Sequence, residues 1–421
     1  MIVTVSPSEI SGILTAPPSK SSMQRAVAAS LMAEGESEIL NPSLCDDARS
    51  AISMAECLGA EVTITDRSVR VKGGFYPKST LLNSGESGLG VRIFSALSAL
   101  GDIGFTLTGE GSLLSRPMNL VTDSLKKFGV EAHSKGGYLP LRIRGPLKGG
   151  KVTIDGSVSS QLLTGLLLAL PVVNDDSRIE VTGLKSKPYI DLTISVLNDF
   201  GIKIENNNYR EFMICGNQKY KSSTYNVEGD WSGAAFILVM AAIAGNVTVK
   251  NLSLSSHQPD KMIIEILRMA GASVVEKDNE IRVGKGSLKP FMVDVSESPD
   301  LAPPLVALAA NCNGVSIIEG TDRLRVKESN RGNTLQKEFT RIGVNIKNRG
   351  SSLEISGSQI KGGETVFSHN DHRIAMALAT AALTAERAIK IEGAEAVSKS
   401  YPSFFIDLEL LRKKTFKDKV T

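Results

Sequence analysis

Lysine and arginine residues cluster in short segments that precede apolar, helix-forming runs of this chain. Six of these cations are Lys20, Arg116, Lys327, Arg331, Arg373 and Lys399. Several have Ser, Asn or Asp as neighbours, the residues that most often cap helices. A helix N-terminus carries about half a positive charge and unpaired N–H groups, so a cation beside it strengthens an anion-binding site. The pattern predicts binding of phosphates or carboxylates.

A serine-rich segment adds uncharged donors to this set. Gly156-Ser157-Val158-Ser159-Ser160-Gln161 places three hydroxyls and an amide before the apolar run 162–173. Capping needs only one serine, so the surplus favours contacts with a ligand. For isolated segments such as 19–21 or 323–331, a solvated helix face is the alternative interpretation.

A repeat of about 70 residues must position these side chains. A glycine, followed by two short β-patterned runs, recurs at intervals of 70, 72, 70 and 72 residues, at Gly59, Gly129, Gly201, Gly271 and Gly343. The residue pattern of each repeat predicts a strand, a buried helix, a second strand, a surface helix and a hairpin, in that order. Six units account for essentially all 421 residues if the run Ile2 to Val5 completes the last unit.

The buried helices are expected to begin near Ser19, Ser87, Ser157, Asp230, Ser298 and Asn370. Equivalent places in stacked repeats lie near each other, so helix starts of this kind should share a direction. The six cations fall at the helix starts, whereas charges without a function would be scattered. This register favours an anion-binding surface over solvated helix faces.

Composition excludes several classes of function. A net charge of +3 is too small for a nucleic-acid-binding surface. The apolar runs 162–173 and 234–244 are too short to span a bilayer, and no basic stretch precedes an apolar one at the N-terminus, so we expect a cytoplasmic protein. The four cysteines form no C-x-x-C pair, and His369 and His372 have no third ligand nearby in sequence, so no metal is expected.

The chain resembles the 5-enolpyruvylshikimate-3-phosphate synthase family of enolpyruvyl transferases over nearly its full length. The combination of motifs is specific, above all the serine-rich segment together with the last two basic motifs. The matching segments are Ser19-Lys20-Ser21 with Arg25, Gly109-Glu110 through Arg116-Pro117, residues 155–161, Ser186-Lys187-Pro188-Tyr189-Ile190-Asp191, Glu228-Gly229-Asp230, Pro299-Asp300, Arg325-Val326-Lys327-Glu328, Asn370-Asp371-His372-Arg373 and Lys399.

The resemblance implies an α/β fold of two domains, each an inverted α/β barrel of three βαβαββ-type repeats. One domain would comprise residues 16–228, and the other residues 1–15 and 229–421. The active site would lie in the cleft between them, and closure around the ligands would exclude water from the reaction.

The implied reaction transfers the enolpyruvyl (1-carboxyvinyl) group of phosphoenolpyruvate to the 5-hydroxyl of shikimate 3-phosphate and releases phosphate. By similarity, shikimate 3-phosphate would be bound by Ser21, Arg25, Ser159, Ser160, Ser186, Tyr189, Asp300 and Lys327. Phosphoenolpyruvate would be bound by Lys20, Gly88, Arg116, Gln161, Arg331, Arg373 and Lys399. The two phosphates and two carboxylates of the substrates explain why so many cations are needed.

The same resemblance implies general acid–base catalysis by Asp300, Glu328 and Lys20, with the individual proton transfers left open. No organic cofactor or metal is expected, because the leaving phosphate is already activated. The partners would be the two small-molecule substrates, without nucleic acid or membrane, and the enzyme would be a monomer.

Three departures from the family pattern bear on affinity and on the response to inhibitors. Pro18 stands where glycine is usual, and Arg323 stands where asparagine is usual. The segment Glu86-Ser87-Gly88-Leu89-Gly90-Val91-Arg92 replaces the commoner N-A-G-T-A-M-R and adds a carboxylate near an expected phosphate.

Three other functions were weighed. The enolpyruvyl transferase that acts on a UDP-amino sugar commonly has a cysteine on the loop around 111–116, and none occurs here. RNA 3′-terminal phosphate cyclase has a related repeat, but its histidine context and a basic surface are missing. A non-catalytic phosphosugar-binding protein would not need both Asp300 and Glu328.

Overall fold

The computed structural model describes residues 1–412, which form two compact units. Unit 1 comprises Met1–Pro17 and the chain from Gly229 onward, and unit 2 comprises Pro18–Glu228. The first boundary falls after Pro17 because this segment is still bonded to unit 1. Ala16 N donates to Lys250 O at 2.9 Å, and Asp230 N donates to Pro17 O at 2.7 Å.

Unit 2 contains three four-stranded sheets of one pattern: a parallel outer pair followed by antiparallel strands. The first sheet has the order β16 (Thr224–Asn226), β4 (Glu36–Leu40), β6 (Ser68–Lys72), β5 (Glu61–Ile64). The second is β7 (Leu81–Asn83), β8 (Gly104–Thr108), β10 (Tyr138–Arg144), β9 (Glu131–Lys135). The third is β11 (Gly150–Asp155), β12 (Ser177–Thr182), β14 (Glu211–Ile214), β13 (Glu205–Asn207). A short pair joins β3 (Ala33–Glu34) to β15 (Tyr220–Lys221).

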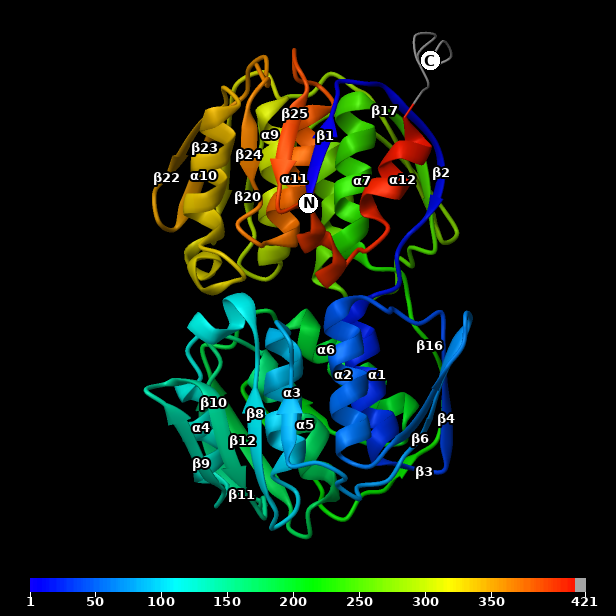
Figure 1. Cartoon of the computed structure of the whole chain (residues 1–421), viewed down its shortest axis with the longest axis vertical. Coiled ribbons are helices and arrows are strands. Elements are labelled where there is room, and N and C mark those ends of the chain that lie inside the picture. Colours follow the sequence, from blue (N-terminus) through cyan, green and yellow to red (C-terminus); the bar gives the residue numbers. More distant parts are fainter. Residues whose placement is uncertain (413–421) are drawn as a thin grey trace. The chain divides into compact units, whose positions relative to one another are not determined.

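Two kinds of helix fill unit 2 (Figure 1). The first helix of each repeat is almost wholly buried: α1 (Lys20–Met32), α3 (Gly88–Ser98) and α5 (Gln161–Ala169), the last extended by η2 (Leu170–Val172). The second helix buries one face: α2 (Asp46–Cys57), α4 (Asn119–Lys127) and α6 (Pro188–Asp199). A 3₁₀ turn, η1 (Gly111–Ser115), precedes α4.

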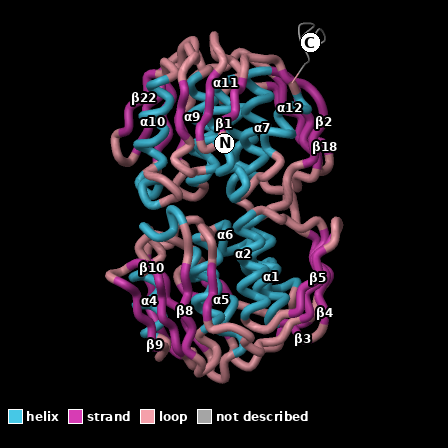
Figure 2. The backbone as a smooth tube through the Cα atoms, in the orientation of Figure 1, coloured by secondary structure: helices cyan, strands magenta, loops and turns pink. Residues whose placement is uncertain are grey.

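Two sheets of unit 1 repeat this four-stranded pattern, and the third has three strands, a parallel pair followed by one antiparallel strand. The first sheet has the strand order β2 (Ile10–Thr15), β17 (Gly245–Lys250), β19 (Glu280–Gly284), β18 (Ser273–Lys277). The second is β20 (Met292–Asp294), β21 (Val315–Glu319), β23 (Ser352–Ser356), β22 (Asn345–Asn348). The third is β24 (Thr365–Phe367), β25 (Ile389–Glu392), β1 (Ile2–Val5). Figure 2 shows the strands of each unit outside its helices.

The buried helices of unit 1 are α7 (Trp231–Ala244), α9 (Ala302–Ala310) and α11 (His372–Ala382), and every residue of α7 is buried. The surface helices are α8 (Ile263–Met269), α10 (Arg331–Arg341) and α12 (Phe404–Leu411). Four 3₁₀ turns lead into helices: η3 (Pro259–Met262), η4 (Pro299–Leu301), η5 (Asp322–Val326) and η6 (Ala394–Lys399).

The predicted α/β fold of repeated units is confirmed by these elements. All five repeat glycines have left-handed φ angles, from 79° to 128°, which end each surface helix and start its hairpin. β1 pairs antiparallel with β25, so the N-terminal strand completes the last repeat as expected.

Two details differ from the expectations. α5 begins at Gln161 and not near Ser157, because Asp155 Oδ1 accepts a hydrogen bond from Ser157 N at 2.8 Å and holds a turn there. α9 begins at Ala302, after the η4 turn that Pro299 opens. The chain passes between the units twice, and the strand before each passage pairs within the unit that the chain leaves. β2 pairs with β17 in unit 1, and β16 pairs with β4 in unit 2.

Candidate active site

Lys20 stands at the start of α1, as the sequence predicted, but it is paired with an acidic residue. Ser19 caps the helix by accepting a hydrogen bond from Ser22 N. The Lys20 ammonium lies 2.7 Å from Asp47 Oδ2 on α2, and both side chains are largely buried. The two residues lie 27 positions apart, and no residue pattern indicated this pairing. Asp47 therefore sets the orientation and charge balance of a predicted catalytic lysine.

Arg25 is buried and connects three helices of unit 2. Its Nε donates to Thr193 Oγ1 at 2.9 Å, and a terminal nitrogen donates to Tyr189 O at 3.2 Å. The other terminal nitrogen donates to Ser21 O at 2.8 Å. Burial lowers the pKa of the guanidinium to about 10. Arg25 thus holds the backbone of two predicted ligands, Ser21 and Tyr189, whatever else it binds.

The serine-rich segment leads directly into α5, which begins at its last residue, Gln161. Ser159 Oγ accepts a hydrogen bond from Gln161 N at 3.2 Å, and Ser160 is the buried residue just before the helix. Ser186, in the loop before α6, is also buried and has a left-handed φ of 56°. A serine pays for this backbone conformation with strain, which is common at functional sites.

Gly88 and Arg116 lie together at the start of α3. A methyl group on Gly88 would lie 2.4 Å from a terminal nitrogen of Arg116. The Arg116 guanidinium therefore occupies the space beside this glycine. Arg92, one turn later on α3, was not among the predicted ligands. It donates to Gly88 O at 2.7 Å and to Gln161 Oε1 at 3.2 Å.

These contacts bring the first turns of four helices of unit 2 together. Gln24 on α1 accepts a hydrogen bond from Ser87, the cap of α3, at 2.8 Å. Arg92 joins α3 to α5, and Arg25 joins α1 to α5 and α6. The predicted residues of unit 2 therefore form one neighbourhood, rich in cations and N–H donors, which suits an anionic ligand.

Unit 1 holds a buried cluster of cations around Asp300, a residue of η4. Asp300 Oδ1 lies 2.8 Å from a terminal nitrogen of Arg331 and 3.3 Å from Lys327 Nζ. Its other oxygen, Oδ2, lies 3.2 Å from Arg373. Burial raises the pKa of the Asp300 carboxyl, but the three cations lower it much more, so that it lies well below its usual range. Asp300 is therefore ionised at neutral pH.

Arg331, the first residue of α10, is held by three carboxylates. Its Nε donates to Asp371 Oδ2 at 2.8 Å, and its terminal nitrogens donate to Asp300, Glu328 and Asp371 Oδ1. Asp371 is fully buried and caps α11 as well. From the sequence, Asp371 was expected only as part of a motif and as a helix cap. Its contact with Arg331, across 40 residues, appears only in the fold.

The pKa values of the surrounding cations reflect the same cluster. Burial lowers the pKa of Arg331, but Asp371, Glu328 and Asp300 raise it above its usual range. Burial also lowers the pKa of Arg373, but the negative charge of Asp300 raises it more, so that the pKa lies above its usual value. Burial is the main reason why the pKa of Lys327 is lowered, and Arg331 and Arg323 lower it further. Lys327 is thus the cation of the cluster whose proton is held least firmly.

Lys399, the last residue of η6, reaches the turn before α11, where Asn370 O accepts a hydrogen bond from its ammonium. Asn370 and the preceding His369 both have left-handed φ angles, of 55° and 54°. Glu338 on α10 holds this turn, because its carboxylate accepts from Phe367 N at 3.1 Å and lies 2.9 Å from His369 Nε2. Lys399 is thereby connected to the segment that supplies Asp371 and Arg373.

The three departures from the family pattern have identifiable surroundings. Glu86 turns toward η1, where its Oε2 accepts hydrogen bonds from Ser112 N and Oγ at 2.9 and 3.0 Å. Arg323 donates to Ser296 O at 3.3 Å and adds positive charge near Lys327. Pro18 lies directly before Ser19, whose N–H donates to Glu228 O at 2.8 Å.

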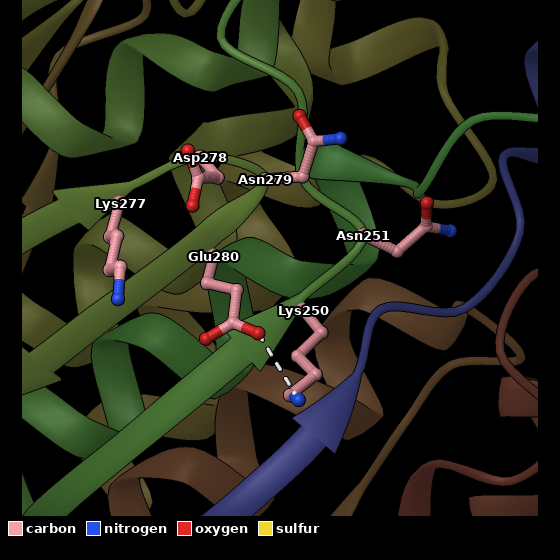
Figure 3. Close-up of a pocket in the computed structure, with 6 residues that line it drawn as sticks. All are labelled: Lys250, Asn251, Lys277, Asp278, Asn279 and Glu280. Carbon is pink, nitrogen blue, oxygen red and sulfur yellow. Dashed lines mark ion pairs between the residues drawn. The ribbon is translucent and has the colours of Figure 1, made fainter.

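Other potential sites were searched in residues 1–412. No cluster of three or more potential metal ligands of the His, Cys, Asp or Glu types lies in this part of the chain. None of its helices is long and apolar enough to cross a membrane. Figure 3 shows a polar pocket of about 280 Å³ in unit 1, lined by Lys250, Asn251, Lys277, Asp278, Asn279 and Glu280. It contains none of the predicted site residues, and Lys250 and Glu280 form an ion pair across it.

Comparison with known proteins decides among the functions weighed above. A sequence model of the EPSP synthase (3-phosphoshikimate 1-carboxyvinyltransferase) family matches residues 5–408. The chain belongs to the EPSP synthase family. A 3-phosphoshikimate 1-carboxyvinyltransferase of Clostridium kluyveri is 39% identical over 412 residues, which cover 97% of each chain. One from Clostridium perfringens strain 13 is 36% identical over 414 residues, covering 97% of this chain and 98% of its own.

Solved structures agree with this assignment. An EPSP synthase from Acinetobacter baumannii superposes with a TM-score of 0.83 at 25% identity and covers 98% of both chains. The enolpyruvyl transferase NikO from Streptomyces tendae shares the fold, with a TM-score of 0.80 at 16% identity and 97% coverage of both chains. The resemblance identified from the motifs is confirmed, and with it the two-domain inverted α/β fold of EPSP synthases.

Proposed function

We propose that this chain carries out the EPSP synthase reaction with the residues of the two clusters described above. The enolpyruvyl group of phosphoenolpyruvate is transferred to the 5-hydroxyl of shikimate 3-phosphate, and phosphate is released. The observation that best supports this is the surroundings of Asp300, an ionised and largely buried carboxylate that contacts Arg331, Arg373 and Lys327. Glu328, a second carboxylate, forms an ion pair with Arg331. Cations suit anionic substrates, and carboxylates suit proton transfer.

The proposed ligands of shikimate 3-phosphate come mostly from unit 2. Hydroxyls at the α5 and α6 starts bind its phosphate, and Arg25 with Ser21 binds its carboxylate. The set is Ser21, Arg25, Ser159, Ser160, Ser186, Tyr189, Asp300 and Lys327. In support, Arg25 bonds directly to the backbone of Ser21 and Tyr189, so that three of these residues form one structural group.

The proposed ligands of phosphoenolpyruvate are cations and donors from both units. Its phosphate is bound by Lys20, Gly88, Arg116, Gln161 and Lys399, and its carboxylate by Arg331 and Arg373. The position of Arg116 beside Gly88 supports a phosphate site there, because a guanidinium and the N-terminus of an eleven-residue helix attract the same anion.

Asp300 is proposed to accept the proton of the attacking hydroxyl. Surrounded by three cations it is ionised but weakly basic. When the carboxylate of phosphoenolpyruvate binds Arg331 and Arg373, the new negative charge raises the pKa of Asp300 and makes it a better base. Substrate binding would thus activate the proton acceptor.

Glu328 and Lys20 are proposed for the second proton, which must reach the methylene carbon of phosphoenolpyruvate during addition and leave it during elimination of phosphate. Glu328 is hydrogen-bonded to Arg331, the proposed ligand of the substrate carboxylate. Lys20 is paired with Asp47, which keeps its ammonium in place. No cofactor enters this scheme, since the enol phosphate carries its own leaving group.

The two units are proposed to act on the same substrate pair, with the active site in the cleft between residues 16–228 and the remainder of the chain. The division of ligands supports this, since Lys20, Arg116 and Gln161 belong to unit 2, whereas Arg331, Arg373 and Lys399 belong to unit 1. Each unit thus supplies part of the proposed ligand set for the phosphates and carboxylates of the substrates. A cytoplasmic monomer remains the expected form of the enzyme.

A phosphate-release assay with both substrates tests the proposal. Phosphate should appear only when phosphoenolpyruvate and shikimate 3-phosphate are both present, together with an equal amount of the enolpyruvyl ether product by mass spectrometry. Release from phosphoenolpyruvate alone, or transfer to a UDP-amino sugar in place of shikimate 3-phosphate, would contradict it. Binding of both ligands without turnover would identify a non-catalytic protein.

A further inference from the structure

Two loops of unit 2 are joined beside the start of α3. The first, residues 83–87, precedes α3, and the second, residues 109–116, contains η1. Glu110 N donates to Gly85 O at 2.7 Å. Ser112 adds two bonds to the first loop, from its N–H and its hydroxyl to Glu86 Oε2, at 2.9 and 3.0 Å.

Each loop ends at a proposed phosphoenolpyruvate ligand. Gly88 begins α3 two residues after Glu86, and Arg116 follows η1 four residues after Ser112. A terminal nitrogen of Arg116 would lie 2.4 Å from a methyl group on Gly88, so the guanidinium covers the first residue of α3. The bonds to Glu86 therefore fix the loop from which Arg116 reaches the helix start.

Gly111 shows how closely the carboxylate fits this loop. A Cβ atom on Gly111 would lie 2.3 Å from Cδ of Glu86 and within 2.6 Å of both its oxygens. The φ of Gly111 is +51°, which also favours glycine. The carboxylate fills the space above Gly111 and is directed toward the η1 backbone. A negative charge near an anion site should weaken binding, so its presence here calls for a compensating role.

We propose that Glu86 is a positioning residue for Arg116. By accepting both hydrogen bonds from Ser112, it holds η1 in the conformation that lays the Arg116 guanidinium over Gly88. This inference deepens the proposed function and rests on it, because it assigns the affinity for the phosphate of phosphoenolpyruvate in part to Glu86. Shikimate 3-phosphate, bound by other residues, is unaffected.

Two substitutions at Glu86 separate positioning from charge. Glu86→Ala removes both bonds, whereas Glu86→Gln removes the charge but keeps an oxygen that can accept them. We expect Glu86→Ala to raise the KM for phosphoenolpyruvate about tenfold, the effect of losing charge-assisted hydrogen bonds. The KM for shikimate 3-phosphate should stay within about twofold, and Glu86→Gln should restore most of the loss. Glu131→Ala, at an exposed position of β9, is the control.

Four kinetic outcomes would overturn the proposal. Glu86→Ala could leave both KM values unchanged, or raise both equally, which would indicate a general structural role. Both variants could lower the KM for phosphoenolpyruvate, which would show that Glu86 acts by repelling the phosphate. A Glu86→Gln variant as impaired as Glu86→Ala would show that the charge, and not the hydrogen bonds, is required.

Amide hydrogen exchange, measured on the ligand-free protein, tests the positioning role of Glu86 independently of enzymatic activity. The amide of Ser112 should exchange faster in Glu86→Ala than in the wild type and in Glu86→Gln. Unchanged exchange would overturn the positioning role even if the wild type is active. Failure of the wild type to release phosphate, with the predicted exchange pattern intact, would overturn the proposed function alone.

Discussion

A carboxylate accepts a proton only while it is ionised, and Asp300 is held in that form by its surroundings. Three cations contact its two oxygens, and its pKa lies well below the usual range. Glu328 accepts a hydrogen bond from Arg331, and an amide oxygen at this position could accept it as well. Glu328→Gln therefore keeps this contact and removes the proton chemistry, whereas Asp300→Asn keeps only one of the two oxygens that face cations.

We predict that Asp300→Asn and Glu328→Gln each lower kcat by about 10²- to 10⁴-fold, the usual contribution of a general acid or base. Binding of shikimate 3-phosphate should largely survive in Glu328→Gln, as measured by calorimetry. Glu319→Gln, at an exposed position at the end of β21, is the matched control and should be nearly as active as the wild type. Turnover close to normal in either test variant would remove that residue from the mechanism.

Gly88→Ala is predicted to raise the KM for phosphoenolpyruvate. The added methyl group would lie only 2.4 Å from a terminal nitrogen of Arg116, so the guanidinium would have to move. Bulkier phosphonate inhibitors such as glyphosate should be weakened more, while shikimate 3-phosphate binding and thermal stability change little. Steady-state kinetics with each substrate varied in turn measure this. Gly104→Ala is a suitable control, since a methyl group there meets no atom within 4 Å. Equal losses for both substrates would instead give Gly88 a role in the fold.

At the scale of secondary-structure elements, the starts of α10 and α11 depend on each other. Arg331 begins α10, and Asp371 caps α11 while accepting two hydrogen bonds from that arginine. Both side chains are buried, at 1% and 0% exposure. A buried carboxylate that has lost its cation destabilises the folded state. The pair therefore stabilises the contact between the two helices only when both residues are present.

Arg331→Met should therefore lower the free energy of unfolding of unit 1 by about 3 to 5 kcal/mol. Adding Asp371→Asn should recover part of that loss, since the unpaired charge is then removed. Urea unfolding can be followed by the fluorescence of Trp231 in α7, the only tryptophan of the sequence. Arg341→Met, on the exposed face of the same helix, should cost less than about 1 kcal/mol. A similarly small loss for Arg331→Met would show that the pair contributes little.

The elements were largely predictable because each carries a local signal. Ser19, Ser87 and Asp230 cap the helices expected at those places, and the five repeat glycines adopt the left-handed turns that their spacing indicated. The start of α5 was misplaced because an aspartate side chain, two residues upstream, holds Ser157 in a turn. Local competition of this kind is difficult to recognise from residue types alone.

The partners of the site residues could not be predicted in the same way. Lys20 meets Asp47, and Arg331 meets Asp371, across 27 and 40 residues, through contacts that only the packed fold creates. Arg25 had been expected to bind a ligand, yet most of its contacts hold the backbone and side chains of α1, α5 and α6. Sequence patterns identified which residues gather at helix starts, but not how their charges are balanced.

At the scale of the whole molecule, the chain passes between two units of similar design. The strand before α1 belongs to the sheet of unit 1, and the strand before α7 belongs to a sheet of unit 2. At each passage between the units, the preceding strand is paired with a parallel strand, and the helix that follows is capped and buried.

The central claim is that both units act on one pair of substrates, and small-angle X-ray scattering tests it most directly. The radius of gyration should be measured for the free protein, with shikimate 3-phosphate alone, and with shikimate 3-phosphate plus a phosphonate analogue of phosphoenolpyruvate. We predict a smaller radius with both ligands, because anions shared by Arg116 and Arg331 draw their units together. An unchanged radius at saturating concentrations of both ligands would contradict closure of the two units around a shared site.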